Sequence, residues 1–140
     1  MVLRTLELYP QPRVQRVVLL GTPIGDSFGA RGLARLPFGR TLLGRSMADW
    51  LTVGISAGVP GVEIGTIAGN LRFGLGAAVV KGMPPPNDGV VTVGETRFAG
   101  MRDHLVMPVS HSGMVLSSAV ARQVCEFLER GAFLHADAPR

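Results

Sequence analysis

Three short apolar runs, each ending in a turn or loop, constrain the fold of this 140-residue chain more than any other feature. The runs are 14–23, "VQRVVLLGTP", then 59–70, "VPGVEIGTIAGN", and 103–113, "DHLVMPVSHSG". Their apolar side chains occupy both alternating faces, which is typical of strands that are buried on both sides. We therefore expect an α/β fold in which parallel strands are covered by flanking helices.

Two segments beside these runs have helical patterns. Residues 117–133, "SSAVARQVCEFLERGAF", place four apolar side chains on one stripe: Val120, Val124, Phe127 and Leu128. A serine can cap the start of this amphipathic helix, and Gly131 lies past its end. The first residues, "MVLRTLELYPQP", have helical composition and stop at Pro10, but no N-cap precedes them. They resemble a helix whose beginning has been removed.

Composition and length narrow the class of protein. Apolar residues make up 46% and charged residues 17%, so we expect a packed chain of one domain or part of one. Lys81 is the only lysine among the 14 basic residues, and the arginines form no basic run, so nucleic-acid binding is not expected. The lone Cys125 lies in the helical pattern, where we expect a buried, inert thiol.

The sequence also bears on location. No apolar run approaches the ~18 residues of a transmembrane segment. Arg4 and Glu7 interrupt the first residues where a signal peptide needs an apolar stretch. A cytoplasmic location is therefore expected.

Asp88 and His111 are the candidate catalytic residues, because each follows a predicted strand. Asp88 lies in the loop "PPPNDGVV" after the second strand, and His111 follows the third strand in "VSHSGM". Reacting groups gather at the carboxyl ends of parallel strands, where a carboxylate can orient an imidazole for general base catalysis. The alternative for each residue is structural, since Asn-Asp-Gly is a common turn and "SHSG" can be a solvated loop. If the catalytic interpretation holds, an Asp88 oxygen lies about 2.6 to 3.2 Å from a His111 ring nitrogen.

The motifs "VVLLGTPIGDS", "PNDGVVTV" and "LVMPVSHSGM", followed by an amphipathic helix, resemble the C-terminal half of a serine α/β hydrolase of the bacterial lipase and esterase type. The resemblance covers nearly the whole chain, so residues 1–140 would form a partial α/β-hydrolase domain. It implies that Asp88 is the acid and His111 the base of a catalytic triad, and that residues 24–57 form a lid or cap. It also implies a carboxylic ester hydrolase that acts on an acyl ester or lipid-like substrate without a cofactor or metal.

The family's nucleophile is expected to be absent from this chain. In the family, the motif Gly-His-Ser-x-Gly-Gly precedes the helix that leads to the Gly-Thr-Pro strand, and "MVLRTLELYP" resembles that helix. The oxyanion hole should be missing as well. We therefore expect a chain that is inactive alone and forms a homo-oligomer or associates with a missing N-terminal half. The alternative is a non-catalytic, hydrolase-like module for binding or oligomerisation.

A second alternative places the nucleophile within the chain. Residues 54–58, "GISAG", match the Gly-x-Ser-x-Gly pattern, and the order Ser56, Asp88, His111 is that of the hydrolase triad. The pattern needs a helix directly after the serine, and Pro60 and Gly61 prevent one. A self-sufficient hydrolase that uses Ser56 is therefore the weaker interpretation.

The remaining histidines give no further site. We expect His104 to be a strand-edge residue at the opposite end of the third strand from His111, Asp103 to be solvated, and His135 to lie in a tail without a partner. The three histidines lack metal-ligand spacing, so no metal site is predicted.

Overall fold

The computed structural model describes residues 2–24, 58–74 and 82–135. The predicted lid, apart from Ile24, and the candidate nucleophile Ser56 lie outside the described residues. The description below concerns the described segments, which include all three predicted strands and both predicted helices.

The three apolar runs form one parallel sheet, as predicted. The strands are β1 (Arg16–Leu20), β2 (Glu63–Gly69) and β3 (Asp103–Met107), in the order β1-β2-β3. Leu20 pairs with Ile67, and Ile67 with Leu105, so the three strands run in register. Their carboxyl ends therefore meet at one edge of the sheet, and the α/β class is confirmed.

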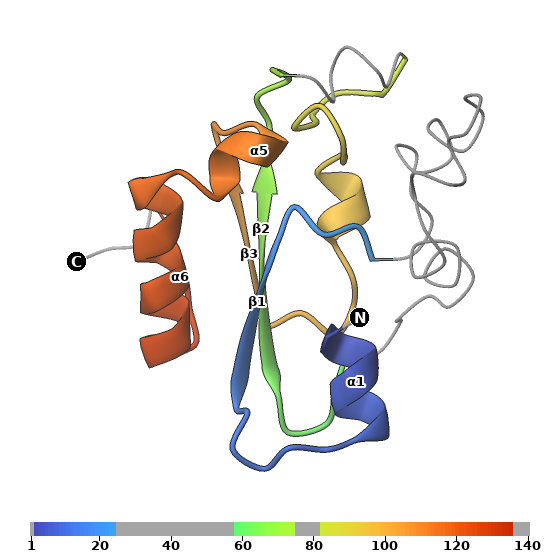
Figure 1. Cartoon of the computed structure of the whole chain (residues 1–140), viewed down its shortest axis with the longest axis vertical. Helices are drawn as coiled ribbons and strands as arrows, with labels where there is room; N and C mark the ends of the chain where they lie inside the picture. Colours follow the sequence, from blue (N-terminus) through green and yellow to red (C-terminus); the bar gives the residue numbers. More distant parts are fainter. Residues whose placement is uncertain (1, 25–57, 75–81, 136–140) are drawn as a thin grey trace.

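Helices lie on both sides of this sheet (Figure 1). The N-terminal helix α1 (Val2–Leu8) packs on one face and the long helix α6 (Ser118–Arg130) on the other. A 3₁₀ turn, η1 (Gly94–Thr96), precedes β3, and a short helix, α5 (His111–Met114), follows it.

The two faces of the sheet carry two separate cores. Leu3 and Leu6 of α1 pack with Leu19 and Ile64, whereas Phe127 of α6 belongs to the second core. The second core is completed by Ile67, Met114, Val120 and Phe133. Side chains that alternate along a strand point to opposite faces, so the continuous apolar runs supply both cores.

Glycine at position 65 lets α6 approach the sheet closely. A Cβ atom on Gly65 would lie 2.7 Å from the ring of Phe127 and 2.8 Å from that of Phe133. These two rings pack against each other with their centroids 4.9 Å apart. Any larger residue at position 65 would have to displace this aromatic pair.

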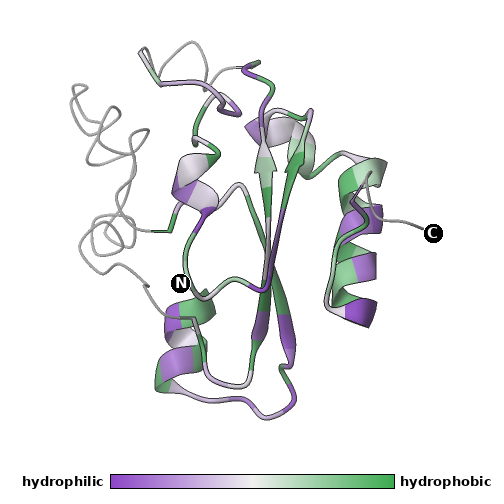
Figure 2. Cartoon of the chain, turned by 180° about the vertical axis from the view of Figure 1, so that it is seen from behind, coloured by the Kyte–Doolittle hydropathy of each residue, from purple (hydrophilic) through white to green (hydrophobic). Residues whose placement is uncertain are grey.

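Helix α6 begins and ends where the sequence predicts. The Ser117 hydroxyl accepts a hydrogen bond from the Val120 N–H, and Gly131 ends the helix in the left-handed conformation with φ of +76°. Figure 2 shows hydrophobic and hydrophilic residues alternating along the helix. Its buried stripe is narrower than predicted: Leu128 is 46% exposed, and the expectation of a buried Cys125 is wrong, because this thiol is exposed.

Charged residues join the beginnings of the strands to the end of α6. Glu63 of β2 accepts a hydrogen bond of 2.7 Å from Arg16 Nε and pairs with Arg102 on its other side. Arg16 also donates to the carbonyl oxygens of Leu128 and Glu129, and Arg102 donates to that of Gly131. The arginines thus satisfy the last carbonyl groups of α6, where positive charge is favourable. The hydrogen bond from Arg16, helped by the charges of both arginines, holds the pKa of Glu63 below its usual range.

In the part of the chain that the structure describes, no helix combines the length and apolar character needed to cross a membrane.

Candidate functional site

Asp88 lies in a tight turn that uses one of its carboxylate oxygens. Its Oδ1 accepts hydrogen bonds from the N–H groups of Val90 (2.9 Å) and Val91 (2.7 Å), and its own N–H donates to the Val91 carbonyl. The residue is 1% exposed. Asn-Asp-Gly therefore forms a turn, as this sequence commonly does. It leaves the second oxygen, Oδ2, for another partner.

His111 is that partner. Its Nδ1 lies 2.8 Å from Asp88 Oδ2, which is the distance expected from the sequence. The backbone N–H of His111 also donates to the Asp88 carbonyl, so two hydrogen bonds join these residues. The Ser110 hydroxyl accepts a hydrogen bond from the Gly113 N–H and caps the short helix α5 that begins with His111.

This contact determines which ring nitrogen of His111 is available for chemistry. Because an ionised carboxylate only accepts hydrogen bonds, Nδ1 is the donor in this contact, and a neutral imidazole in this tautomer has its lone pair on Nε2. Among the described residues, Nε2 has no hydrogen-bond partner. The imidazole is 38% exposed while its carboxylate partner is buried. The pair therefore lies at the boundary between the protein interior and the surface.

Two glycines at the ends of β1 and β2 lie directly beside the Asp88–His111 pair. Gly21 has φ of +50°, and a Cβ atom there would lie 3.0 Å from His111 Nδ1 and 3.1 Å from Asp88 Oδ2. A Cβ atom on Gly69 would lie 2.3 Å from the Val109 carbonyl oxygen and 2.8 Å from Asp88 Cβ. The sequence predicts both only as turn glycines. Their second role is to let the strand ends approach the Asp88–His111 pair.

His104 lies apart from this pair, near the beginning of β3. Its Nε2 is 2.9 Å from the hydroxyl of Thr96. This hydroxyl donates its own hydrogen to the Val93 carbonyl, so it accepts a hydrogen bond from the His104 Nε2–H. The other ring nitrogen, Nδ1, is buried and has no hydrogen-bond partner in the segments that the structure describes. Burial, together with the charge of Arg97, lowers the pKa of His104 to about 4. This histidine is a neutral packing residue.

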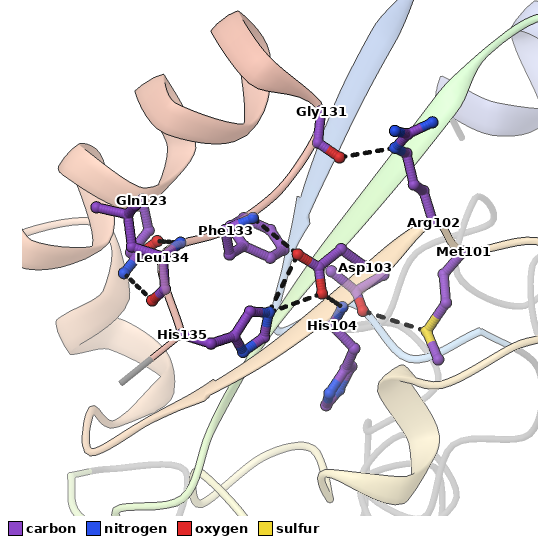
Figure 3. A network of polar contacts seen from close by, with 10 residues as sticks. Met101, Arg102, Asp103, His104, Gln123, Gly131, Phe133, Leu134 and His135 are labelled. Carbon is purple, nitrogen blue, oxygen red and sulfur yellow. Dashed lines mark hydrogen bonds and ion pairs between the residues drawn. The ribbon is translucent and has the colours of Figure 1, made fainter. Parts of the chain in front are cut away.

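Asp103 and His135 form a second acid–histidine pair, which corrects two predictions (Figure 3). The Asp103 carboxylate accepts hydrogen bonds from the N–H of Phe133 at 2.7 Å and from His135 Nε2 at 2.9 Å. His135 thus has a partner, and Asp103 is bonded within the protein. Burial raises the pKa of Asp103, but these hydrogen bonds and one from the His104 N–H lower it to below its usual range.

This second pair holds the segment that follows α6. Gln123 of α6 exchanges two hydrogen bonds with the backbone of Leu134, at 2.9 and 3.0 Å, so residues 133–135 are tied to both β3 and α6. Here the ring atom that contacts the carboxylate is Nε2, whereas in the first pair it is Nδ1. The second pair lies at the beginning of β3, and the first lies beyond its end. We assign it a structural role.

The site can supply a base to a hydrolytic reaction. A neutral imidazole oriented by a buried carboxylate can take a proton from a hydroxyl group or water. Within the described segments, no group of three or more His, Cys, Asp and Glu side chains is placed to hold a metal ion. No family model matches the chain, and comparisons with curated proteins and with solved structures found no similar protein.

Proposed function

We propose that this chain contributes the acid and base of a Ser–Asp–His triad to a carboxylic ester hydrolase. The observation that carries the proposal is the 2.8 Å contact between Asp88 Oδ2 and His111 Nδ1 at the carboxyl ends of parallel strands. Parallel strands with helices on both faces are compatible with the C-terminal portion of an α/β-hydrolase fold. The sequence motifs around both residues favour that fold further.

The proposed reaction is acyl transfer through a serine. The serine oxygen forms a bond to the ester carbonyl carbon while His111 Nε2 takes the hydroxyl proton. Breakdown of the tetrahedral intermediate breaks the ester C–O bond, and His111 gives its proton to the departing alcohol. Water then hydrolyses the acyl-enzyme by the same proton transfers. Throughout, Asp88 holds the proton on Nδ1 and stabilises the imidazolium.

We place the serine and the oxyanion donors on a segment upstream of α1, or on an associated chain. Ser56 is the weaker candidate, because Pro60 and Gly61 follow it. Association is supported by the position of β1. Among the described strands β1 pairs only with β2, and its residues Val17, Val18 and Leu20 are only partly buried. A further strand beside β1 would cover them.

An acyl or lipid-like substrate is proposed from the surface around the site. Four large apolar side chains that follow β2 and α5 are exposed: Leu71, Phe73, Val115 and Leu116. They lie at the same end of the sheet as Asp88 and His111. Exposed apolar groups near a site favour an apolar ligand.

The proposal is tested by serine labelling and ester turnover, measured in this chain and in a version that carries the coding sequence upstream of Met1. We expect no fluorophosphonate labelling of the chain alone. In the extended version, His111→Ala should lower ester turnover by about 10⁶-fold. His135→Ala, which removes the histidine of the second acid–histidine pair, should leave turnover unchanged.

Three outcomes contradict parts of this proposal. Labelling of the short chain that disappears in Ser56→Ala would make Ser56 the nucleophile. Equal effects of His111→Ala and His135→Ala would remove the catalytic role of His111. An extended version that neither reacts with the probe nor hydrolyses esters would favour the non-catalytic binding module.

A further inference from the structure

Asn87, the residue before Asp88, is buried and its side-chain amide is fully engaged. Its Nδ2 lies 3.1 Å from the Pro84 carbonyl oxygen and 3.4 Å from that of Met83, and its Oδ1 accepts a hydrogen bond of 3.0 Å from the Gly89 N–H. Asn87 is 3% exposed. One side chain thus connects the chain before Asp88 to the chain after it.

The loop around Asp88 also has backbone hydrogen bonds of its own, among them the one from the Asp88 N–H to the Val91 carbonyl. Asn87 forms an isolated bridge with Thr92, and the Val93 N–H donates to the Pro86 carbonyl. Asp88 Oδ1 accepts hydrogen bonds from two backbone N–H groups of the loop, so the loop fixes the orientation of the carboxylate. The direction in which Oδ2 points therefore depends on the loop conformation.

We propose that Asn87 is a positioning residue, whose side-chain amide holds the loop 83–93 in the conformation that directs Asp88 Oδ2 to His111 Nδ1. The catalytic meaning of this inference rests on the proposed function. The geometry it invokes can be measured without a substrate.

The chemistry of the amide explains why other side chains fail at this position. In Asn87→Asp, a carboxylate oxygen replaces the N–H donors, faces two carbonyl oxygens, and adds negative charge beside the buried Asp88. In Asn87→Ser, the hydroxyl can still accept from the Gly89 N–H but is too short to reach the Met83 and Pro84 carbonyls. Both changes remove the side-chain hydrogen bonds that tie the Met83 and Pro84 carbonyls to the turn, while the backbone hydrogen bond from the Val93 N–H to the Pro86 carbonyl remains.

The test observes the hydrogen-bonded Nδ1 proton of His111 by NMR in the full chain labelled with ¹⁵N-histidine. The signal is assigned by its absence in His111→Gln. Asn87→Asp and Asn87→Ser should each abolish the signal or speed its exchange with water at least about tenfold, while the backbone spectrum remains folded. Asn70→Asp is the matched control: it makes the same chemical change at an exposed residue after β2, and should keep the signal.

Three results would overturn the inference. The first is an unchanged Nδ1 proton in a folded Asn87→Asp or Asn87→Ser chain. The second is an equal effect of Asn70→Asp. The third is global unfolding of both Asn87 variants, because the inference assigns Asn87 a local role.

Turnover of the extended version separates this inference from the proposed function. If both hold, Asn87→Ser lowers kcat about 10- to 100-fold with little change in KM, as expected for a misplaced catalytic group. Loss of the Nδ1 proton in a protein that never hydrolyses esters would retain the positioning role and reject the hydrolase. Full turnover with Asn87→Ser would reject the positioning role alone.

Discussion

The two ends of the three-stranded sheet both hold carboxylates next to basic side chains, but these carboxylates differ in burial and in their partners. At the strand beginnings, Glu63 lies partly exposed between Arg16 and Arg102, and both arginines also bond the last carbonyls of α6. At the carboxyl ends, Asp88 is buried and contacts a single imidazole, that of His111. Figure 2 shows the hydrophilic residues at the strand beginnings.

The two ends differ in the hydrogen-bond partners of their polar side chains. The side chains of Arg16, Glu63 and Arg102 bond to one another, and the two arginines bond to the last carbonyls of α6, so the cluster supports the packing of α6. The Asp88–His111 pair keeps one basic nitrogen without a partner among the described residues. A buried carboxylate that orients a partly exposed imidazole is an arrangement suited to general base catalysis.

The largest effect on stability is expected at the carboxyl end, from Gly69→Ala. The added methyl group would meet the Val109 carbonyl oxygen at 2.3 Å and Asp88 Cβ at 2.8 Å, so β2 or the Asp88 loop must shift. We expect the free energy of unfolding to fall by about 1 to 3 kcal/mol and the His111 Nδ1 proton to be lost. Chemical denaturation and NMR measure these two effects.

The control for this change is Gly94→Ala, where the nearest atom to the added methyl group is 3.9 Å away. It should change the free energy of unfolding by less than about 0.5 kcal/mol. A Gly69→Ala chain as stable as Gly94→Ala would show that the strand end does not support the site closely.

A smaller effect is expected at the strand beginnings, from Gly131→Ala. Gly131 has φ of +76°, and a Cβ atom there would lie 2.7 Å from Glu63 Oε2. Gly61 has φ of +77°, and no atom of the described residues lies within 4 Å of the position that a Cβ atom would take. Gly61→Ala therefore measures the cost of the left-handed backbone conformation without a steric clash. We expect each to cost about 1 kcal/mol for the left-handed conformation, with an additional loss only in Gly131→Ala. If thermal unfolding shows the same loss of stability in both variants, the Glu63 side chain moves away from the added methyl group at no cost.

Some of the structural features behind these predictions can be inferred from the sequence. The caps of α6 are local, because Ser117 and Gly131 occupy the positions that helix-capping rules assign to them. The contact between Asp88 and His111 is predictable because parallel strands bring their carboxyl ends together. These inferences need only the residue types at the helix ends, the period of the apolar residues and the positions of Asp88 and His111 after predicted strands.

Other features required the three-dimensional structure. Asp103 and His135 are 32 positions apart, and no periodic pattern links the tail after α6 to the beginning of β3. The close approach of Gly69 to Asp88 depends on the path of the loop, which short motifs do not specify. Leu128 is exposed because the helix surface that reaches the core is limited to Val120, Val124 and Phe127.

An effect of pH on stability is expected from His104. Its pKa is about 4 in the folded chain against an ordinary value of 6.5, so the unfolded chain binds more protons between these values. Stability should therefore be full above pH 6.5 and fall as the pH drops to 4, by about 1 kcal/mol after allowance for solvent screening. His104→Gln should flatten this part of the stability curve measured by denaturation. An unchanged slope would mean that the buried Nδ1 atom carries no penalty on protonation.

The central claim is that one acid–histidine pair is catalytic and the other structural, and matched substitutions of their acids test it most directly. Asp88→Asn and Asp103→Asn make the same change in the two pairs of the extended version. Asp88→Asn should lower kcat for ester hydrolysis by about 10⁴-fold, because it disturbs the tautomer of His111. Asp103→Asn should leave kcat unchanged and lower only the free energy of unfolding. Equal kcat values for the two variants would contradict the account.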